Sequence, residues 1–473
     1  MDSSLPFETS SRRSVLFLIL TIPLLFGAIH PFVQGLYTCF MLIGAGGWWI
    51  FVGSKKNLRP SRRRRRRPAV ADKPEKSETA EKSEKAVAWR TRFMLVSVLL
   101  LLYVAFTVVP LPLGLLHWLS PERARNLAAV NSLAGAGIRF APLSYSAFLT
   151  FKQALFYISL LFYYLSLRKL LDRDRHFVMQ VAAVMVGVAF FEALYGLLQF
   201  MNSGMGVLWL PSSLGAAGVA RGTIIYRNQY ATLLNMCWPL ALAVAALNIK
   251  KRPPALFLFG AGMIILAVLF SLSRGGIIAL LCIAVFLGAG MPFPRREKVR
   301  AVLVLVIFLA VYGALLGGYG TLLQRFADFK SGAGERFSIW CMSLPMLFDH
   351  PLTGIGLESY IRLSPLYIKN GSGTLLWDRA HNEFLELAIE LGWPAMLLFC
   401  AFLFSGLSGL ARRLRRRQDL LIGMAAFAGI CGFFIHGLVD FGWHLPANCV
   451  YCVTLLALLG AELGKLPGSD GII

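Results

Sequence analysis

Residues 379–392 read RAHNEFLELAIELG, and within them a polar loop changes into a long apolar span. The apolar residues continue to residue 408, and a membrane-crossing helix needs about 20 of them, so this stretch predicts a transmembrane helix. His381 lies at the start of that span, after a long loop rich in polar and aromatic residues. A protonatable side chain at such a boundary indicates chemistry at the bilayer surface.

The composition extends this interpretation to the whole chain. Of 473 residues, 57% are hydrophobic and 15% are charged, and the mean hydropathy is +0.65. Soluble proteins are less apolar than this. We therefore expect an all-α polytopic membrane protein with about twelve transmembrane helices. The expected spans are 14–29, 32–53, 93–113, 151–168, 177–200, 229–248, 255–272, 275–291, 301–318, 384–408, 420–440 and 444–463.

The distribution of Lys and Arg predicts the orientation. Most of the 47 basic residues fall in the loops of one side, chiefly in residues 54–92 and 412–417. Short cytoplasmic loops collect positive charge, so both termini are predicted to be cytoplasmic. The opposite, external side then carries loops 114–150, 201–228 and 319–383. The last of these is one large loop between the ninth and tenth spans.

Three units follow from this layout. Residues 1–53 are predicted to form an N-terminal transmembrane hairpin, and residues 54–92 a basic, disordered cytoplasmic loop. Residues 93–473 form a helical membrane body that includes loop 319–383. The run Arg62–Arg67 is typical of nucleic-acid binding, but no folded recognition module surrounds it. We favour a solvated loop in contact with anionic membrane lipids, and no nucleic-acid partner.

Three external arginines lie on the predicted side of His381. Arg274, in Ser273-Arg274-Gly275-Gly276, interrupts apolar sequence near the outer boundary. A charge there costs several kcal/mol unless it is paired or solvated, which favours a function over a snorkelling helix end. Arg221 and Arg336 lie in loops, where an arginine alone indicates little.

Other residues allow two interpretations each. Glu192 lies in the middle of a span and is expected to face the bundle. His436 and Asp440 are four residues apart, on one helix face, as a structural pair or a proton relay. Trp340, Tyr360 and Trp377 could stack on sugar rings or anchor the chain at the interface. Residues Glu335 to Phe348 have the spacing of an amphipathic helix on the membrane, and Cys449 and Cys452 are interpreted as helix packing.

A series of motifs resembles the O-antigen ligase and O-antigen polymerase superfamily. The match lies in order, spacing and sidedness over residues 220–395. Its motifs are Arg221-Gly222-Thr223, Arg227-Asn228-Gln229-Tyr230-Ala231, Ser273-Arg274-Gly275-Gly276, Arg336 with Trp340, Asp349-His350-Pro351-Leu352-Thr353-Gly354-Ile355-Gly356 with Tyr360, and His381-Asn382 with Glu390-Leu391-Gly392. Two features depart from the pattern: Gln229 stands where the family often has histidine, and the basic insert 54–92 is extra.

The resemblance implies a glycosyltransferase at the periplasmic face of the bacterial inner membrane. The donor would be a glycan on undecaprenyl diphosphate, and the acceptor a sugar hydroxyl of lipid A core, as in lipopolysaccharide assembly by an O-antigen ligase. An O-antigen or exopolysaccharide polymerase, which extends a carrier-linked glycan, is the alternative within the superfamily. No metal and no cofactor are implied.

The residues suit this chemistry. Arginine binds phosphate oxygens bidentately and stays charged, so Arg221, Arg274 and Arg336 are the candidates to bind the diphosphate. Histidine titrates near neutral pH, so His381 is the candidate base for the acceptor hydroxyl. Supporting roles are expected for Asn228, Tyr360, Asn382 and Glu390.

A transporter of lipid-linked glycans is a more distant alternative, in which His381 would couple proton movement. Transporters show internal repeats and polar residues at midplane depth. Here the polar residues gather at one outer boundary, which favours an enzyme.

Overall fold

The structure is a computed structural model of the chain. It describes residues 5–56, 94–202, 204–210, 218–247, 255–290, 329–368, 377–415 and 420–463, with isolated positions between 296 and 310. Almost all of the expected basic loop 54–92 and most of the expected span 301–318 lie outside the described residues. Parts of loop 319–383 lie outside them as well.

The described part of the chain is mostly helical. The eleven expected spans other than 301–318 each overlap a described helix, because long apolar runs satisfy their backbone groups internally only as helices. These helices are α1 (Leu5–Leu24), α2 (Pro31–Lys56), Met94–Val108, α6 (Ala147–Leu171), α7 (Arg175–Met201), α8 (Arg227–Leu247), α9 (Ala255–Phe270), α10 (Arg274–Gly290), α15 (Glu383–Arg415), α16 (Leu421–Gly437) and α17 (Pro446–Leu463).

Four of these helices are long and apolar enough to cross a membrane: α6, α7, α8 and residues Glu383–Arg412 of α15. Shorter apolar helices, including α9, α10 and α16, pack among them. The chain is therefore a helical membrane protein. The total of twelve spans stays a prediction.

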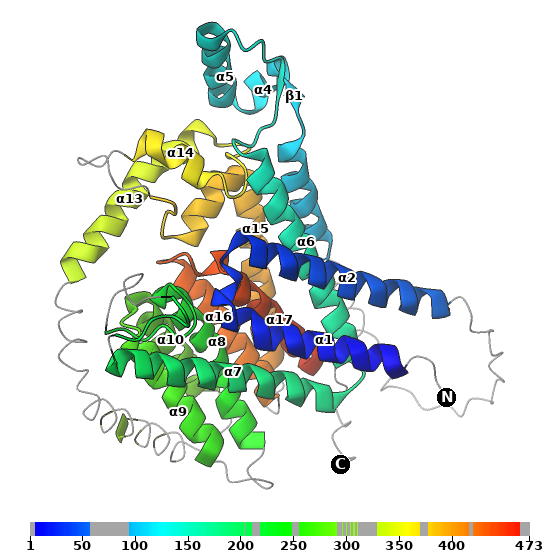
Figure 1. The fold of residues 1–473 in the computed structure, drawn as a ribbon, viewed down its shortest axis with the longest axis vertical. Coiled ribbons are helices and arrows are strands. Elements are labelled where there is room, and N and C mark those ends of the chain that lie inside the picture. Colours follow the sequence, from blue (N-terminus) through cyan, green and yellow to red (C-terminus); the bar gives the residue numbers. More distant parts are fainter. Residues whose placement is uncertain are drawn as a thin grey trace.

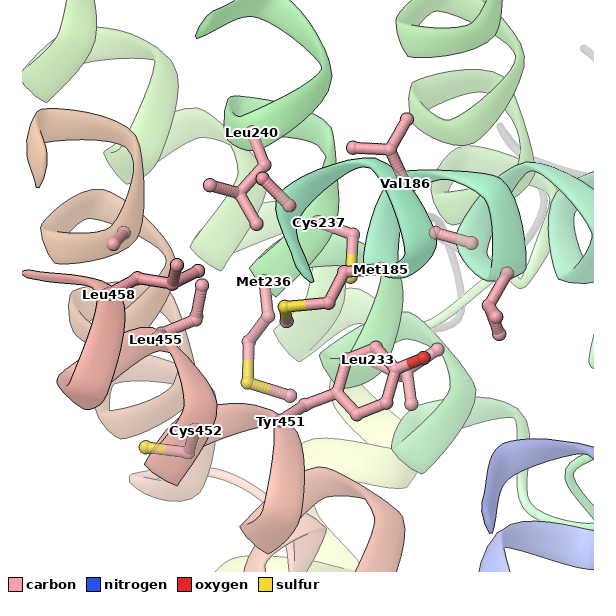
Figure 2. Close-up of a cluster of buried hydrophobic side chains, with 14 of the residues drawn as sticks. Met185, Val186, Leu233, Met236, Cys237, Leu240, Tyr451, Cys452, Leu455 and Leu458 are labelled. Carbon is pink, nitrogen blue, oxygen red and sulfur yellow. The ribbon is translucent and has the colours of Figure 1, made fainter. Parts of the chain in front are cut away.

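The main core lies where α8 packs between α7, α9, α16 and α17. Figure 2 shows a part of it, in which Met185 of α7, Met236 and Cys237 of α8, and Tyr451 of α17 come together. Cys449 and Cys452 are free thiols buried in the same core, so the interpretation of these cysteines as helix packing is confirmed.

Two of the expected external loops, 114–150 and 319–383, contain helices of their own, which lie in the upper half of Figure 1. The expected helix of the large loop is confirmed as α13 (Phe329–Asp349), and α14 (Tyr360–Tyr367) follows it. Both pack against the start of α15 around a second core that contains Ile339, Met346, Ile355 and Ile389.

A smaller lobe forms from loop 114–150. Helices α4 (Leu113–Leu119) and α5 (Pro121–Ala134) pack on each other beside two short strands, β1 (Leu111–Pro112) and β2 (Phe140–Ala141). The strands pair antiparallel, Leu111 opposite Ala141. This pair is a small exception to the expected all-α fold, and it closes the base of the lobe.

The loop after α13 packs against a kink in α15. Gly392 has φ +76° inside α15, and Gly354 has φ +65°. A Cβ on Gly354 would lie 2.3 Å from the carbonyl oxygen of Glu390, so only glycine permits this approach. The amide of Ile355 donates to the carbonyl of Ile389 at 3.1 Å. The glycines of the motif at 349–356 therefore seat the outer loop on α15.

Candidate active site

His381 stands directly before α15, and its neighbour Asn382 begins that helix. The Asn382 side-chain oxygen accepts hydrogen bonds from the amides of Phe384 and Leu385, both at 3.1 Å. This is the geometry of an N-cap, so the supporting role of Asn382 is to begin α15. His381 itself has φ +54°, a left-handed conformation that is uncommon outside glycine. Backbone strain of this kind persists only where surrounding contacts hold it.

Asp440 brings His381 and Arg336 together. Nδ1 of His381 lies 3.7 Å from Oδ1 of Asp440, and Nη2 of Arg336 donates to Oδ2 of the same carboxylate at 3.0 Å. Nη1 of Arg336 donates to the carbonyl of Val439 at 2.6 Å. The Asp440 side chain is only 1% exposed, so its charge requires these partners.

Asp440 lies three residues beyond the end of α16, outside the helix. Burial acts to raise the pKa of Asp440, but His381 and Arg336 outweigh burial and hold the pKa below its usual range. A charged carboxylate therefore faces the imidazole. It can orient the ring and stabilise its protonated form, as in serine hydrolase triads.

Aromatic side chains enclose the imidazole. The His381 ring meets Phe441 edge to face, with ring centroids 4.7 Å apart, and Trp377 at 6.0 Å. Trp340 donates from its indole nitrogen to the carbonyl of Ala380 at 3.0 Å. Trp340 therefore fixes the backbone beside His381, and the His381 side chain stays 20% exposed.

Arg274 begins α10, and the two glycines after it let that helix start pack closely. A Cβ on Gly275 would lie 2.8 Å from the ring of His436 and 2.7 Å from Val439. The Ser273 hydroxyl accepts a hydrogen bond from the amide of Gly276 at 3.2 Å, as an N-cap does. The motif therefore packs Gly275, the chain neighbour of Arg274, against the segment that carries Asp440.

Arg221 lies in the loop between α7 and α8, where its residue is 4% exposed. Burial lowers the pKa of Arg221. Within the part of the chain that the structure describes, its guanidinium makes no ion pair. The amide of Ala220 donates to the carbonyl of Phe270 at 2.9 Å, which ties this loop to the end of α9, close to Ser273 in the chain. A buried guanidinium that has no ion-pair partner among the described residues is suited to an anionic ligand.

Glu192 explains how the loop of Arg221 is held. Its two carboxylate oxygens accept hydrogen bonds from the amide of Thr223 at 2.8 Å and from the Thr223 hydroxyl at 2.6 Å. Gly222, at φ +60°, has no space for a Cβ, which would lie 2.1 Å from Glu192. The expectation that Glu192 faces the bundle is confirmed, since the side chain is fully buried. Glu192 is an anchor for the Arg221-Gly222-Thr223 turn.

Substitution of Glu192 tests its role as this anchor. Glu192→Leu should lower the melting temperature of the purified protein and raise the donor KM several-fold, because a buried amide left without an acceptor costs about 1–3 kcal/mol. Glu192→Gln, which keeps one acceptor oxygen, should show smaller changes. Differential scanning fluorimetry and initial rates measure both effects. An unaltered donor KM in the leucine variant would show that Arg221 is positioned without Glu192.

The next motif, at the start of α8, contacts Phe441, the residue whose ring packs on His381. Gln229 donates from its side-chain nitrogen to the carbonyl of Phe441 at 3.3 Å, so the residue that departs from the family pattern supports the ring that covers His381. Asn228 is half-buried in the first turn of α8. Its backbone carbonyl accepts from the Thr232 hydroxyl at 3.0 Å.

Tyr360 and Glu390 hold the outer helices. Tyr360 is fully buried, and its hydroxyl lies 2.7 Å from that of Ser343 in α13. Its amide donates to a carboxylate oxygen of Glu390 at 3.2 Å. A buried ring cannot stack on a sugar or anchor at a membrane surface, so both expectations for Tyr360 are wrong. Its role is packing, and Glu390 supports the start of α14.

The expected pairing of His436 with Asp440 is replaced by other contacts. Nδ1 of His436 lies 2.8 Å from the Thr232 hydroxyl, and Nε2 lies 3.5 Å from the hydroxyl of Ser273. The helix ends at Gly437, so the four-residue spacing no longer places Asp440 on the same helical face. Asp440 is free to turn toward His381 and Arg336.

Sequence reasoning did not identify a second cluster of charges beside His381. The carboxylates of Glu358, Glu383, Glu386 and Glu390 line a small cavity with His444. Arg379 forms ion pairs with Glu358 at 2.7 Å and with Glu386 at 3.0 Å. The sequence does contain an indication of this cluster, since Glu383, Glu386 and Glu390 recur at helical spacing within an apolar stretch.

The charges of this cluster are mutually dependent. Burial opposes charge on Glu358, but Arg379 and His444 outweigh burial and lower the pKa of Glu358. Burial and the neighbouring Arg379 oppose protonation of His444, which lies in the short turn η3 (Gly442–His444). The carboxylates of Glu383, Glu386 and Glu358 outweigh both effects and raise the pKa of His444 to about 10. His444 is therefore a cation at neutral pH.

The fold and these contacts define a helical membrane protein with a histidine, a buried carboxylate and several arginines at one end of the bundle. Residues 255–400 match the family model described as O-antigen ligase. The match supports placing the chain in the O-antigen ligase and polymerase superfamily, whose members are ligases and polymerases of the glycosyltransferase type. The matched segment contains Arg274, Arg336 and His381. No curated protein matches the chain at a significant level.

Proposed function

We propose that the protein transfers a glycan from undecaprenyl diphosphate to a sugar hydroxyl at the periplasmic face of the inner membrane, as an O-antigen ligase does. The observation that carries this proposal is the group of His381, Asp440 and Arg336, which three separate segments bring together. The family match supplies the reaction class, and the group supplies a base with a charged partner. Lipid A core is the proposed acceptor.

In the proposed reaction His381 removes the proton from the acceptor hydroxyl. Since Nδ1 faces Asp440, Nε2 is the ring nitrogen that accepts this proton. The acceptor oxygen forms a bond to the anomeric carbon of the donor sugar, and the bond from that carbon to the diphosphate oxygen breaks. The electron pair leaves with the diphosphate, and Asp440 stabilises the imidazolium that remains.

The leaving diphosphate gains negative charge, which fixed cations can stabilise. Arg221 and Arg274 are the proposed groups, because Arg221 precedes α8, Arg274 begins α10, and the starts of these helices pack together at Ala231 and Gly276. Arg336 was a candidate for the same contact. Its bonds to Asp440 and Val439 favour a different role, in which Arg336 holds the carboxylate that faces His381.

The Arg274 proposal predicts a strict requirement for guanidinium. Arg274→Lys should reduce kcat/KM about as strongly as Arg274→Ala, on the order of a hundredfold, because lysine cannot bind two phosphate oxygens in a fixed plane. Arg125→Lys, on the exposed side of α5, is the matched control and should retain transfer. Full activity of the Arg274→Lys variant in initial-rate assays would reduce the requirement to a positive charge.

The reaction itself is tested by incubating the purified protein in nanodiscs with carrier-linked glycan and lipid A core. Ligase activity gives core carrying the glycan, which gel electrophoresis and mass spectrometry identify. A longer carrier-linked chain in place of a modified core identifies the polymerase alternative. Movement of donor between leaflets of proteoliposomes without any new glycosidic bond would contradict both and favour a transporter.

A further inference from the structure

Two acidic residues in the first turn of α15 hold the two loops that carry His381 and Asp440. Glu386 accepts a hydrogen bond from the amide of Ala380 at 2.8 Å, one residue before His381. Glu383 accepts from the amide of Trp443 at 2.5 Å, three residues after Asp440. The same helical turn is therefore bonded to the backbone on both sides of the His381–Asp440 contact.

His444 and Arg379 join these carboxylates into one unit. Nδ1 of His444 lies 3.1 Å from Glu383, and Nε2 lies 3.3 Å from Glu386. Arg379 reaches the same Glu386 oxygen at 3.0 Å from the opposite loop. Each cation thus belongs to one loop, since Arg379 precedes His381 and His444 follows Asp440. Both contact Glu386.

We infer that Glu383 and Glu386, bridged by His444 and Arg379, are positioning residues that hold His381 and Asp440 at their working distance. Glu383, Glu386, His444 and Arg379 together form what we call the carboxylate clamp. This inference rests on the proposed function for its catalytic consequence, but its structural part does not. The geometry explains why the strained backbone of His381 persists, because Glu386 accepts a hydrogen bond from the amide of Ala380 and Trp340 donates one to its carbonyl.

The energetic reason lies in the burial of the clamp. Glu383 and Glu386 are 3% and 1% exposed, so removing one partner leaves a charge uncompensated, which is strongly destabilising locally. Loss of His444 should therefore loosen both loops together. Because misplacement by about 1 Å can reduce a rate about a hundredfold, the loss should affect kcat more than the binding of donor.

The structural part is tested by hydrogen–deuterium exchange in nanodiscs, without any substrate. His444→Gln should speed exchange in both segments 377–384 and 438–445. The matched control is His350→Gln, since His350 is another buried histidine of this end and contacts Ser120 at 3.2 Å and Tyr145 at 3.3 Å. Its substitution should leave both segments unchanged. Faster exchange confined to 438–445 in His444→Gln would overturn the inference, because the loops would then be independent.

The catalytic part is tested with Glu386→Gln, which keeps the shape and removes the charge. Its kcat should fall at least tenfold while the donor KM stays within about twofold. In an Asp440→Asn background the same substitution should have a much smaller effect, because residues that act through one contact are not additive. Equal losses in both backgrounds would show a general structural role and overturn the inference.

The outcomes separate the two proposals. If the wild-type protein transfers no glycan to any acceptor, the proposed function fails, and the exchange experiment still decides whether the clamp couples the loops. If the wild-type protein transfers glycan, and His444→Gln neither speeds exchange in both segments nor lowers kcat, only the inference about the clamp fails. If His444→Gln does not fold, Glu386→Gln and Arg379→Lys provide the same exchange comparison.

Discussion

His381→Ala should abolish glycan transfer while the protein remains in the membrane at its normal level. In the proposed reaction the imidazole takes the proton of the acceptor hydroxyl, and general base catalysis typically contributes about 10²–10⁴-fold in rate. The loss should appear in kcat at saturating donor. Because the His381 side chain is 20% exposed and borders aromatic rings, its truncation should change the melting temperature little.

The matched control is His117→Ala, which removes an exposed histidine from α4. This variant should transfer glycan at the wild-type rate. Fluorescence-detected size exclusion verifies that both variants are folded, and the modified core is quantified by mass spectrometry. Transfer within about threefold of wild type in the His381→Ala variant would remove the histidine from the chemistry, given its expected general-base contribution.

Asp440→Asn should be the second most damaging substitution, with transfer reduced about a hundredfold or more. The amide has nearly the same volume, but it carries no charge to stabilise the imidazolium, and it leaves Arg336 without its carboxylate. The effect should be strongly non-additive with His381→Ala, since both act on one proton transfer. Steady-state kinetics of the single variants and of the double variant measure it.

Asp349→Asn is the control for the charge change. Asp349 is exposed and accepts a hydrogen bond from the Tyr367 hydroxyl at 2.6 Å, in the outer helices. We expect this variant to keep wild-type kcat. If Asp440→Asn loses activity only through unfolding, its melting temperature falls and the residual folded protein transfers at the wild-type rate. That outcome would exclude a role for Asp440 in the reaction.

The positions of the helices could be predicted from the sequence with good agreement. Apolar runs such as 151–168 and 177–200 lie within α6 and α7, because a predominantly apolar run of that length has few alternatives to a helix. The lobe of α4 and α5 was not predicted as structure. Its core is small, with Leu116, Ala124 and Leu127 among its buried residues, and such short segments have weak periodicity.

The contacts of the candidate site could be predicted only in part. The motifs indicated His381 and the arginines as individual residues, and their catalytic roles stay predictions. The partner of His381 could not be found, because 59 positions separate it from Asp440 along the chain and no periodicity relates residues of different helices. Local spacing suggested His436 for Asp440 instead. That argument fails where α16 ends at Gly437.

The partner of Glu192 could not be predicted from the sequence either. A carboxylate in the middle of a span indicates an interior contact, but the sequence does not say which segment provides it. The structure gives Thr223, 31 residues later, and with it a reason why the Arg221 turn has its shape. The clamp residues Glu383 and Glu386 show a helical pattern in the sequence, while their bridging partner His444 comes from another loop.

Labelling from outside the cell tests most directly whether His381 and Arg274, the proposed base and a proposed phosphate-binding group, share one external site. Cysteines at positions 381 and 274, each introduced singly into a protein lacking its eight native cysteines, are exposed in intact spheroplasts to a membrane-impermeant maleimide. We predict that both positions react before permeabilisation, and that carrier-linked glycan protects both. If one position reacts before permeabilisation and the other only after it, the two groups lie on opposite faces, which would contradict a shared periplasmic site.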